Sequence, residues 1–344
     1  MLRPKSTQTS FYGNHIYDRI IPEDHFLKLL DKAVDFSFIN ELCRDAYTPD
    51  FGRPAYGPEM MFKIIFLQFL YDVSDRRIEE EVNFNLVLKW FVGLAIDESP
   101  PDSSSLTRFR DRLGEELFTN IFNQIVKIAR EKGIVSDRLS IVDSTDVKAK
   151  VDTFKIKDNP DVSPDKDARH GYKSEKKPFF GYKAHASMDS DSELITKLNT
   201  TPGNTHDGKE FPKVVDTRSR MTTADKAYDS NKNHRLLKRK RATSAIITKK
   251  NRKSSRLRKH QMKPEIIAAQ RERPKIERKF AELKRFHGLK EARYWGMAKM
   301  AIQFTMTVIA CNLKRIVKLL FHHGCPVTSE PVSFHQGIAV PILV

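Results

Sequence analysis

Three acidic residues stand far apart in the sequence, at positions where their carboxylates could meet and bind metal ions. Asp143 lies in a run of β-branched residues that predicts a strand, and Asp225 directly follows another short strand. Glu277 lies on a predicted helix and shares one helical face with Arg273 and Lys284, at spacings of i, i+4 and i+11. Hard cations such as Mg²⁺ bind carboxylate oxygens, and two such ions can clamp the attacking and leaving oxygens of a phosphodiester. Such a set of acids predicts phosphodiester chemistry.

Each acid also has an ordinary structural explanation when it is taken alone. Asp143 could be a strand acid that points to solvent, and Asp225 could be a turn or N-cap aspartate. Glu277 could form a surface ion pair with Arg273, which would stabilise the helix by only about 0.3 to 0.5 kcal/mol. Phe280 shares that helical face, which indicates that the pair is at least partly buried. The three positions together favour metal binding.

Helical periodicity dominates up to about residue 136, and a two-residue period begins at Leu139. Helices are predicted at Pro58–Tyr71, Ser74–Asn83 with Ser74 as the N-cap, Leu86–Leu94, Leu106–Leu113 capped by Ser103–Ser105, and Glu115–Lys132. Strands are predicted at Leu139–Val147, Phe180–Met188, Leu194–Thr201, Met221–Ala224 and Ser244–Thr248. The second and third of these strands should form a hairpin, because a turn of Asp and Ser separates them.

The same patterns predict the remaining helices and the domain limits. Helices are expected from a cap at Asn204–Asp207 to about Thr217, at Asn231–Arg241, from Ala268 or Arg271 to His287, and at Ala292–Phe321. The charged segment 151–177 reads as a surface insertion. The fold class is therefore α+β, with a helical domain at 1–136, a mixed-sheet domain at 137–322 and an irregular tail at 323–344.

The charge balance indicates a polyanionic partner. Lys and Arg outnumber Asp and Glu by 61 to 44, for a formal net charge of +17. Nucleic acid fits such a chain better than a membrane, because the most apolar stretch, Met297–Cys311, is short for a bilayer span and reads as a core helix. We expect no signal peptide in the polar segment 1–24. Cys43, Cys311 and Cys325 are too widely spaced for a disulfide framework or a CxxC site, which fits a reducing cytoplasm.

Several stretches resemble the DDE transposases of prokaryotic insertion sequences, whose catalytic core is ribonuclease H-like. They are VDST at Val142–Thr145, GYKAHASMD at Gly181–Asp189, NTHDGKEF at Asn204–Phe211, TADKAYDS at Thr223–Ser230, and ERKFAELKRFHGL at Glu277–Leu289. The helical region resembles the N-terminal domain of the same group in RPAYGPEMMFKIIFLQFLY and PDSSSLTRFRDRLG. The resemblance implies that Asp143, Asp225 and Glu277 bind two Mg²⁺ ions, which Mn²⁺ can replace.

The resemblance also implies a reaction and its partners. One ion would activate water to cut DNA at the end of the element, and the exposed 3′-hydroxyl would then attack target DNA. The N-terminal domain would recognise the terminal inverted repeats, within a homodimer or larger synaptic complex. The third acid of the group lies in the pattern Tyr, two residues, Arg, three residues, Glu, six residues, Lys, and this chain has Gln270 at the Tyr position. In this pattern Lys284 would contact a DNA phosphate, and Arg273 would position Glu277 or the DNA.

Further DNA contacts are predicted from clustered basic residues. Segment 226–263 holds fifteen Lys or Arg and one acid, Asp229. Such runs are often solvated faces, but this one falls between the second and third acids, which favours phosphate contacts that weaken steeply with salt. The candidates in the segment are Arg239, Lys240, Arg241, Lys249, Lys250, Arg252 and Lys253. Lys183 could line the DNA groove from its strand, and Arg108 and Arg110 lie on a short basic helix that resembles the second helix of a helix-turn-helix.

Other readings remain beside this one. His170, His185 and His206 match no zinc-ligand spacing, and His206 and Asp207 are better explained as a helix cap. Asp146 should lie on the strand face opposite Asp143. A metal-dependent nuclease of the same fold would carry the same acids. A transposase-derived DNA-binding protein without catalysis would not need to keep all three.

Overall fold

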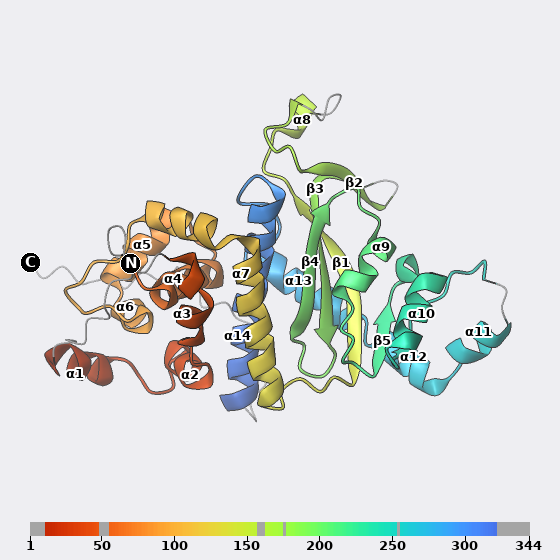
Figure 1. The fold of residues 1–344 in the computed structure, drawn as a ribbon, viewed down its shortest axis with the longest axis horizontal. Coiled ribbons are helices and arrows are strands. Elements are labelled where there is room, and N and C mark those ends of the chain that lie inside the picture. Colours follow the sequence, from red (N-terminus) through yellow and green to blue (C-terminus); the bar gives the residue numbers. More distant parts are fainter. Residues whose placement is uncertain (1–10, 48–54, 157–161, 175–176, 253–254, 322–344) are drawn as a thin grey trace, which may run out of the picture.

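The structure is a computed structural model that describes residues 11–47, 55–156, 162–174, 177–252 and 255–321, and Figure 1 shows a helical region beside a mixed sheet. The helical region contains α1 (Phe11–Ile20), α2 (Phe26–Ala33), α3 (Phe38–Leu42), η1 (Arg44–Ala46), α4 (Pro58–Tyr71), α5 (Asp75–Phe84), α6 (Leu86–Val92) and α7 (Ser103–Glu131). The sheet region contains β1 (Leu139–Lys148), α8 (Thr153–Ile156), β2 (Arg169–Ser174), β3 (Lys177–Asp189), β4 (Ile195–Pro202), α9 (Asp207–Val214), β5 (Met221–Ala224), η3 (Lys226–Tyr228), α10 (Asn231–Arg239), β6 (Thr243–Ser244), α11 (Ser255–Gln261), α12 (Pro264–Arg271), α13 (Pro274–Phe286) and α14 (Met297–Phe321). The predicted α+β class is confirmed.

The helices of the first region begin where local signals predict. Helix α4 has the predicted bounds, with Pro58 in its first turn, where no backbone N–H is needed. The Ser74 hydroxyl caps α5 by accepting a hydrogen bond from the backbone N–H of Arg77 at 3.2 Å. Asp72 ends α4 in a left-handed conformation, with φ at 55°.

Helix α7 spans the two helices predicted at Leu106–Leu113 and Glu115–Lys132, and it differs from the prediction in its cap. The cap is Asp102, whose Oδ1 accepts a hydrogen bond from the Ser105 N–H at 2.8 Å. The two predicted helices are joined into one element, and Gly114 adopts a non-helical backbone with φ at 64° at the point where they meet. Glycine tolerates this positive φ without the strain that a Cβ would cause. The kink at Gly114 therefore divides α7 into the two helices that the sequence predicts.

The sheet places β1 at its centre. Strands β1, β5 and β6 run parallel, and β3 runs antiparallel to β1 and to β4, which confirms the predicted hairpin. Strand β2 pairs with the first half of β3, so the segment 151–177 is not merely the predicted surface insertion. Strand β6 is shorter than predicted, although Ala245 and Ile247 still donate to Thr222 and Ala224 of β5 at 2.8 and 3.0 Å.

Helices cover both faces of the sheet. Alternation along β1 sends Ile141 and Val147 into the large core, which also contains side chains of α13, α14 and the N-terminal helices. Val142 points to the opposite face and packs in a second core with residues of α9 and α10. Asp143 has the same strand parity as Ile141, so its carboxylate faces the side of α13.

Helix α14 lies between the N-terminal helices and the sheet, next to α7 (Figure 1). Most of its side chains are buried, as expected for a core helix, and it begins five residues later than predicted. The Asn312 side chain bonds both the N–H and the C=O of Ile195 in β4, at 3.0 and 2.8 Å. In the part of the chain that the structure describes, no helix has the length and apolarity needed to cross a bilayer. The limits of the two domains stay a prediction, since α14 joins both regions in one core.

Candidate active site

The three acids that the sequence singles out come from three separate elements. Asp143 lies in the middle of β1, and Asp225 follows the last residue of β5, at the carboxyl end of that strand. Glu277 lies in the first turn of α13, which packs against β1. Because β1 and β5 are adjacent and parallel, with Val142 opposite Ala224, Asp143 lies beside Asp225 at the carboxyl end of β5, where ligand sites of open sheets collect.

One arginine links the three carboxylates. The Nη2 of Arg273 lies 3.6 Å from Oδ2 of Asp143 and 3.9 Å from Oε1 of Glu277. Its Nη1 lies 3.9 Å from Oδ1 of Asp225. The structure thus brings the three predicted acids together around one guanidinium.

The electrostatics of the site favour a cation between the acids. Burial raises the pKa of Asp143 to about 6, and the neighbouring Asp225 and Glu277 carboxylates push that pKa in the same direction. The Ser144 N–H, which donates to Asp143 at 2.8 Å, and the Arg273 guanidinium act in the opposite direction. Positive charge near Asp143 would therefore stabilise its ionised form.

The donor set fits divalent hard cations. It offers carboxylate oxygens from two aspartates and one glutamate, and no sulfur or imidazole, which is the chemistry that Mg²⁺ and Mn²⁺ prefer. Glu277 keeps 63 % of its side chain exposed and Asp225 keeps 39 %. Those two carboxylates are open to solvent, whereas Asp143 forms the buried side of the site at 19 %.

The third-acid segment differs in two respects from the prediction. The expected single helix is divided into α12 and α13, because Pro274 lacks the N–H that would continue α12. Arg273 keeps helical dihedrals just before α13, so its place beside Glu277 survives the break. The pair was expected to be partly buried: this holds for Arg273, which is 17 % exposed, and not for Glu277.

The candidate DNA contacts outside the basic segment are mostly paired within the protein. Lys284 bonds Asp146 at 3.0 Å, so Asp146 is engaged by α13 although its strand parity differs from that of Asp143. Lys183 bonds Asp207 at 3.0 Å and is mostly buried.

Arg110, a predicted DNA contact, is buried in the fold. Its side chain is 6 % exposed and forms an ion pair with Asp75 on α5. Helix α5, whose packing at this position the sequence pattern did not reveal, covers the Arg110 side chain. Arg108, two residues earlier on the same helix, is exposed.

The basic segment is anchored by Asp229, which the sequence analysis noted only as the one acid among its cations. The buried carboxylate of Asp229 accepts hydrogen bonds from the Lys249 N–H at 2.8 Å and pairs with the Arg252 Nε at 3.2 Å. His234 adds a third contact at 2.8 Å. Arg252 therefore pairs with an acid of the fold, and its contact with DNA stays a prediction. The sequence signal for this structural role was that Asp229 is the one acid in a run of basic residues.

Most of the other predicted residues of that segment are exposed. They are Arg239, Lys240, Arg241, Lys249 and Lys250. Lys253 lies outside the described residues. The exposed cations follow Asp225 in the chain: they lie at the end of α10, directly after it, and in the segment between β6 and α11.

The three histidines weighed as zinc ligands have separate structural roles. The Nδ1 of His206 accepts a hydrogen bond from the Gly208 N–H at 3.1 Å and caps α9. His185 is buried and its Nε2 lies 2.8 Å from the Thr201 hydroxyl. His170 packs edge-on against Phe180, with ring centroids 4.9 Å apart.

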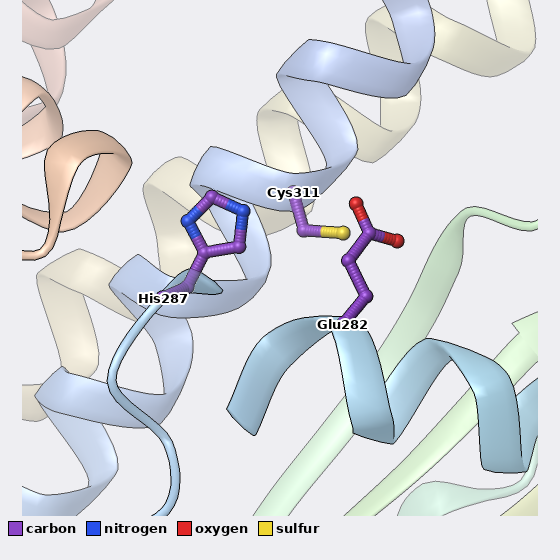
Figure 2. Close-up of side chains that lie close together, drawn as sticks. All are labelled: Glu282, His287 and Cys311. Carbon is purple, nitrogen blue, oxygen red and sulfur yellow. The ribbon is translucent and has the colours of Figure 1, made fainter. Parts of the chain in front are cut away.

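A group of metal-ligand type was not predicted and lies where α13, α14 and the loop between them meet. Figure 2 shows Glu282, His287 and Cys311 pointing toward one another, and their ligand atoms all lie within 4.8 Å of one another. Two lysines also contact the group. The Lys279 Nζ lies 2.9 Å from Glu282 and 3.7 Å from the Cys311 Sγ, and the Lys314 Nζ lies 3.4 Å from the His287 Nε2.

We assign this group to a buried ionic network and not to a metal centre. The two ammonium groups already supply the positive charge that a metal ion would supply. Burial raises the pKa of Cys311 to about 11, so its sulfur is a thiol beside these two ammonium groups. The network fastens α13, which carries Glu277, to α14.

The same network predicts a loss of stability in acid. Burial and the nearby Lys314 ammonium lower the pKa of His287 to about 4, from the ordinary 6.5. Below pH 6.5 the unfolded chain binds a proton that the folded chain rejects, so stability falls between about pH 6.5 and pH 4, by on the order of 3 kcal/mol in total. Above pH 6.5 the residue is neutral in both states and contributes no pH dependence.

Urea denaturation at several pH values measures this loss. His287→Asn removes the titrating ring, and its amide can still donate to the Phe69 carbonyl, which His287 Nδ1 contacts at 3.1 Å. The variant should lose less stability than the native protein between about pH 6.5 and pH 4.5. Equal losses in the two proteins would show that His287 does not cause the acid sensitivity.

Two family models match the chain. A model described as "Transposase domain (DUF772)" matches residues 15–112, and a model described as "Transposase DDE domain" matches residues 135–313. A solved structure with a similar chain is the cryo-EM structure of a piggyBac transposase synaptic complex with hairpin DNA, at 12% identity. That match covers 85% of this chain and 73% of the other, with a TM-score of 0.39, which is too low to support a structural argument.

Proposed function

Because this chain belongs to the DDE transposase family, we propose that it cuts DNA at the ends of an insertion sequence and joins the freed 3′-hydroxyl to target DNA. The observation that carries this proposal is the meeting of Asp143, Asp225 and Glu277 around Arg273. Three acids from a central strand, a neighbouring strand end and a covering helix form a carboxylate site that opens to solvent on one side.

The three carboxylates would hold two divalent ions, Mg²⁺ by preference with Mn²⁺ as a substitute. Such ions, when bound, stabilise the charge on the attacking and leaving oxygens of a phosphodiester. Asp143 supplies a buried and therefore rigid carboxylate, which must be ionised to act. Glu277 and Asp225 supply the solvent-facing side, where a DNA strand can approach.

The DNA would lie across the exposed cations that follow Asp225. They are Arg239, Lys240, Arg241, Lys249 and Lys250, and Arg108 adds an exposed cation on the helical region. Phosphate contacts of this kind release counterions, so affinity should fall steeply as salt rises. We further propose that the helical region recognises the terminal inverted repeats, and that a homodimer or larger complex holds two ends together.

An assay for joined DNA products tests the proposal. The protein is incubated with Mg²⁺, a labelled DNA fragment carrying one end of the element, and a plasmid target. Native protein should give joined products, and Asp143→Asn should reduce them by at least about a hundredfold, because an amide is a poorer ligand for a hard cation than a carboxylate.

The assay also separates the rival functions. Cleavage without joining would indicate a nuclease of the same fold. DNA binding without cleavage in the native protein would indicate a transposase-derived binding protein. Equal activity of the native protein and Asp143→Asn would refute the site assignment.

A further inference from the structure

Arg273 contacts all three acids but bonds none of them closely. Its three carboxylate contacts, at 3.6, 3.9 and 3.9 Å, are too long for hydrogen bonds. Its Nε is buried and has no hydrogen-bond partner among the described residues. A guanidinium offers five N–H donors in a fixed plane, so these acids leave much of its bonding capacity unused.

Arginine forms closer pairs with carboxylates elsewhere in the fold. Arg130 donates from Nε and Nη2 to the two oxygens of Asp137, at 3.0 and 2.9 Å. This is the two-pronged geometry that a guanidinium forms with a carboxylate or a phosphate. Arg273 shares its charge among three acids without reaching that geometry with any of them.

The position of Arg273 makes it a competitor for any cation at the acids. Its guanidinium lies within 4 Å of oxygens from all three carboxylates, so a divalent ion bound there would be repelled by the arginine. Removing the guanidinium from the acids would relieve that repulsion. A DNA phosphate beside the site could then accept the two-pronged bond that the acids do not provide.

We propose that Arg273 exchanges partners: it neutralises the three carboxylates before divalent ions bind, and it bonds a backbone phosphate once ions and DNA are present. This inference rests on the proposed function of the three acids. Arg273 is then a positioning residue that couples two binding events. Binding of the ions frees Arg273 from the acids, and binding of DNA draws Arg273 away from the ions. Divalent ions and DNA should therefore strengthen each other's binding by the same factor.

The affinity for Mn²⁺ in the presence and absence of a short DNA duplex tests the coupling. Electron paramagnetic resonance of unbound Mn²⁺ gives the affinity without any need for catalysis. For the native protein, DNA should strengthen Mn²⁺ binding by roughly 5- to 150-fold. Arg273→Ala should bind Mn²⁺ more tightly than the native protein without DNA, and DNA should then change its affinity little.

Two further variants separate charge from geometry. Arg273→Lys keeps the positive charge but not the planar fork, so it should retain the competition with Mn²⁺ and lose part of the coupling to DNA. Arg271→Ala removes an exposed cation two residues away and should behave as the native protein does. Thermal melting of each variant confirms that it is folded.

Two results would overturn the exchange. If Arg273→Ala binds Mn²⁺ more weakly than the native protein, Arg273 supports the acids and does not compete with the ion. If DNA leaves the native Mn²⁺ affinity unchanged, the two binding events are not coupled. Failure of the proposed function gives a different signature, since Mn²⁺ binding would then be the same in the native protein and in Asp143→Asn.

Discussion

Replacing Glu277 with glutamine should slow DNA cleavage by at least about a hundredfold while changing the free energy of unfolding by less than about 1 kcal/mol. The side chain is 63 % exposed, and its contact with Arg273 at 3.9 Å is too long to contribute much stability. Loss of a negative charge in the first turn of α13 costs a further fraction of a kcal/mol. A large effect on activity without an effect on folding is what a metal-binding carboxylate predicts.

Glu265→Gln is the matched control. Glu265 also lies in the first turn of a helix that begins with proline, is 58 % exposed, and forms a long ion pair, with Lys263 at 3.6 Å. The control should cleave DNA at the native rate. The test measures the cleavage rates and urea denaturation curves of the two variants. Native activity of Glu277→Gln would show that Glu277 is an ordinary surface acid.

Replacing Arg130 with alanine should destabilise the protein by about 3 to 5 kcal/mol, the largest single effect on folding that we expect. Arg130 lies in the last turn of α7, is 14 % exposed, and pairs with both Asp137 and Asp216. Asp216 is 2 % exposed, so the variant would leave a buried carboxylate without its counter-ion. These pairs connect α7 to the segments that enter β1 and β5, the two strands that carry the aspartates.

Arg138→Ala provides the comparison for Arg130→Ala. Arg138 also pairs with an aspartate, Asp191, but it is 59 % exposed, so its loss should cost no more than about 1 kcal/mol. Urea denaturation of both variants measures the difference. If the two variants lose similar amounts of free energy of unfolding, burial of the Arg130 ion pairs does not add to stability.

Local signals explain which elements could be predicted from the sequence. Helix α4 and strand β5 have their predicted bounds, because a helix-starting proline and a short β-branched run act through neighbouring residues. Strand β2 was missed because Arg169–Ser174 contains no β-branched residue and depends on pairing with β3. Its Gly171 passes so close to Gly203 that a Cβ would lie 2.2 Å from the Gly203 oxygen. That contact depends on tertiary structure and leaves no periodic trace.

The candidate site, too, could be predicted from the sequence only in part. Topology led us to expect Asp143, Asp225 and Glu277 near one another, and the structure places them around Arg273. Their metal-binding role stays a prediction. Helical spacing indicated the pair of Arg273 with Glu277. It could not indicate the contacts of Arg273 with the two aspartates, because those contacts join distant parts of the chain.

Basic residues were harder to assign, because a charge in the sequence does not show whether an acid will face it. Three predicted DNA-binding residues form ion pairs within the protein: Lys183 with Asp207, Lys284 with Asp146, and Arg252 with Asp229. Each of these partners is distant in the sequence and was outside the reach of helical or strand periodicity.

Helix α14 also sets the order in which the protein can be built during translation. It follows every other described element in the chain, yet its side chains complete the core of the N-terminal helices and one face of the sheet. Neither region can complete the large core that the two share until α14 has been synthesised. A nascent chain interrupted earlier would expose part of that core and be a target for chaperones and proteases. The cell would then contain few partial proteins able to occupy DNA without the complete site.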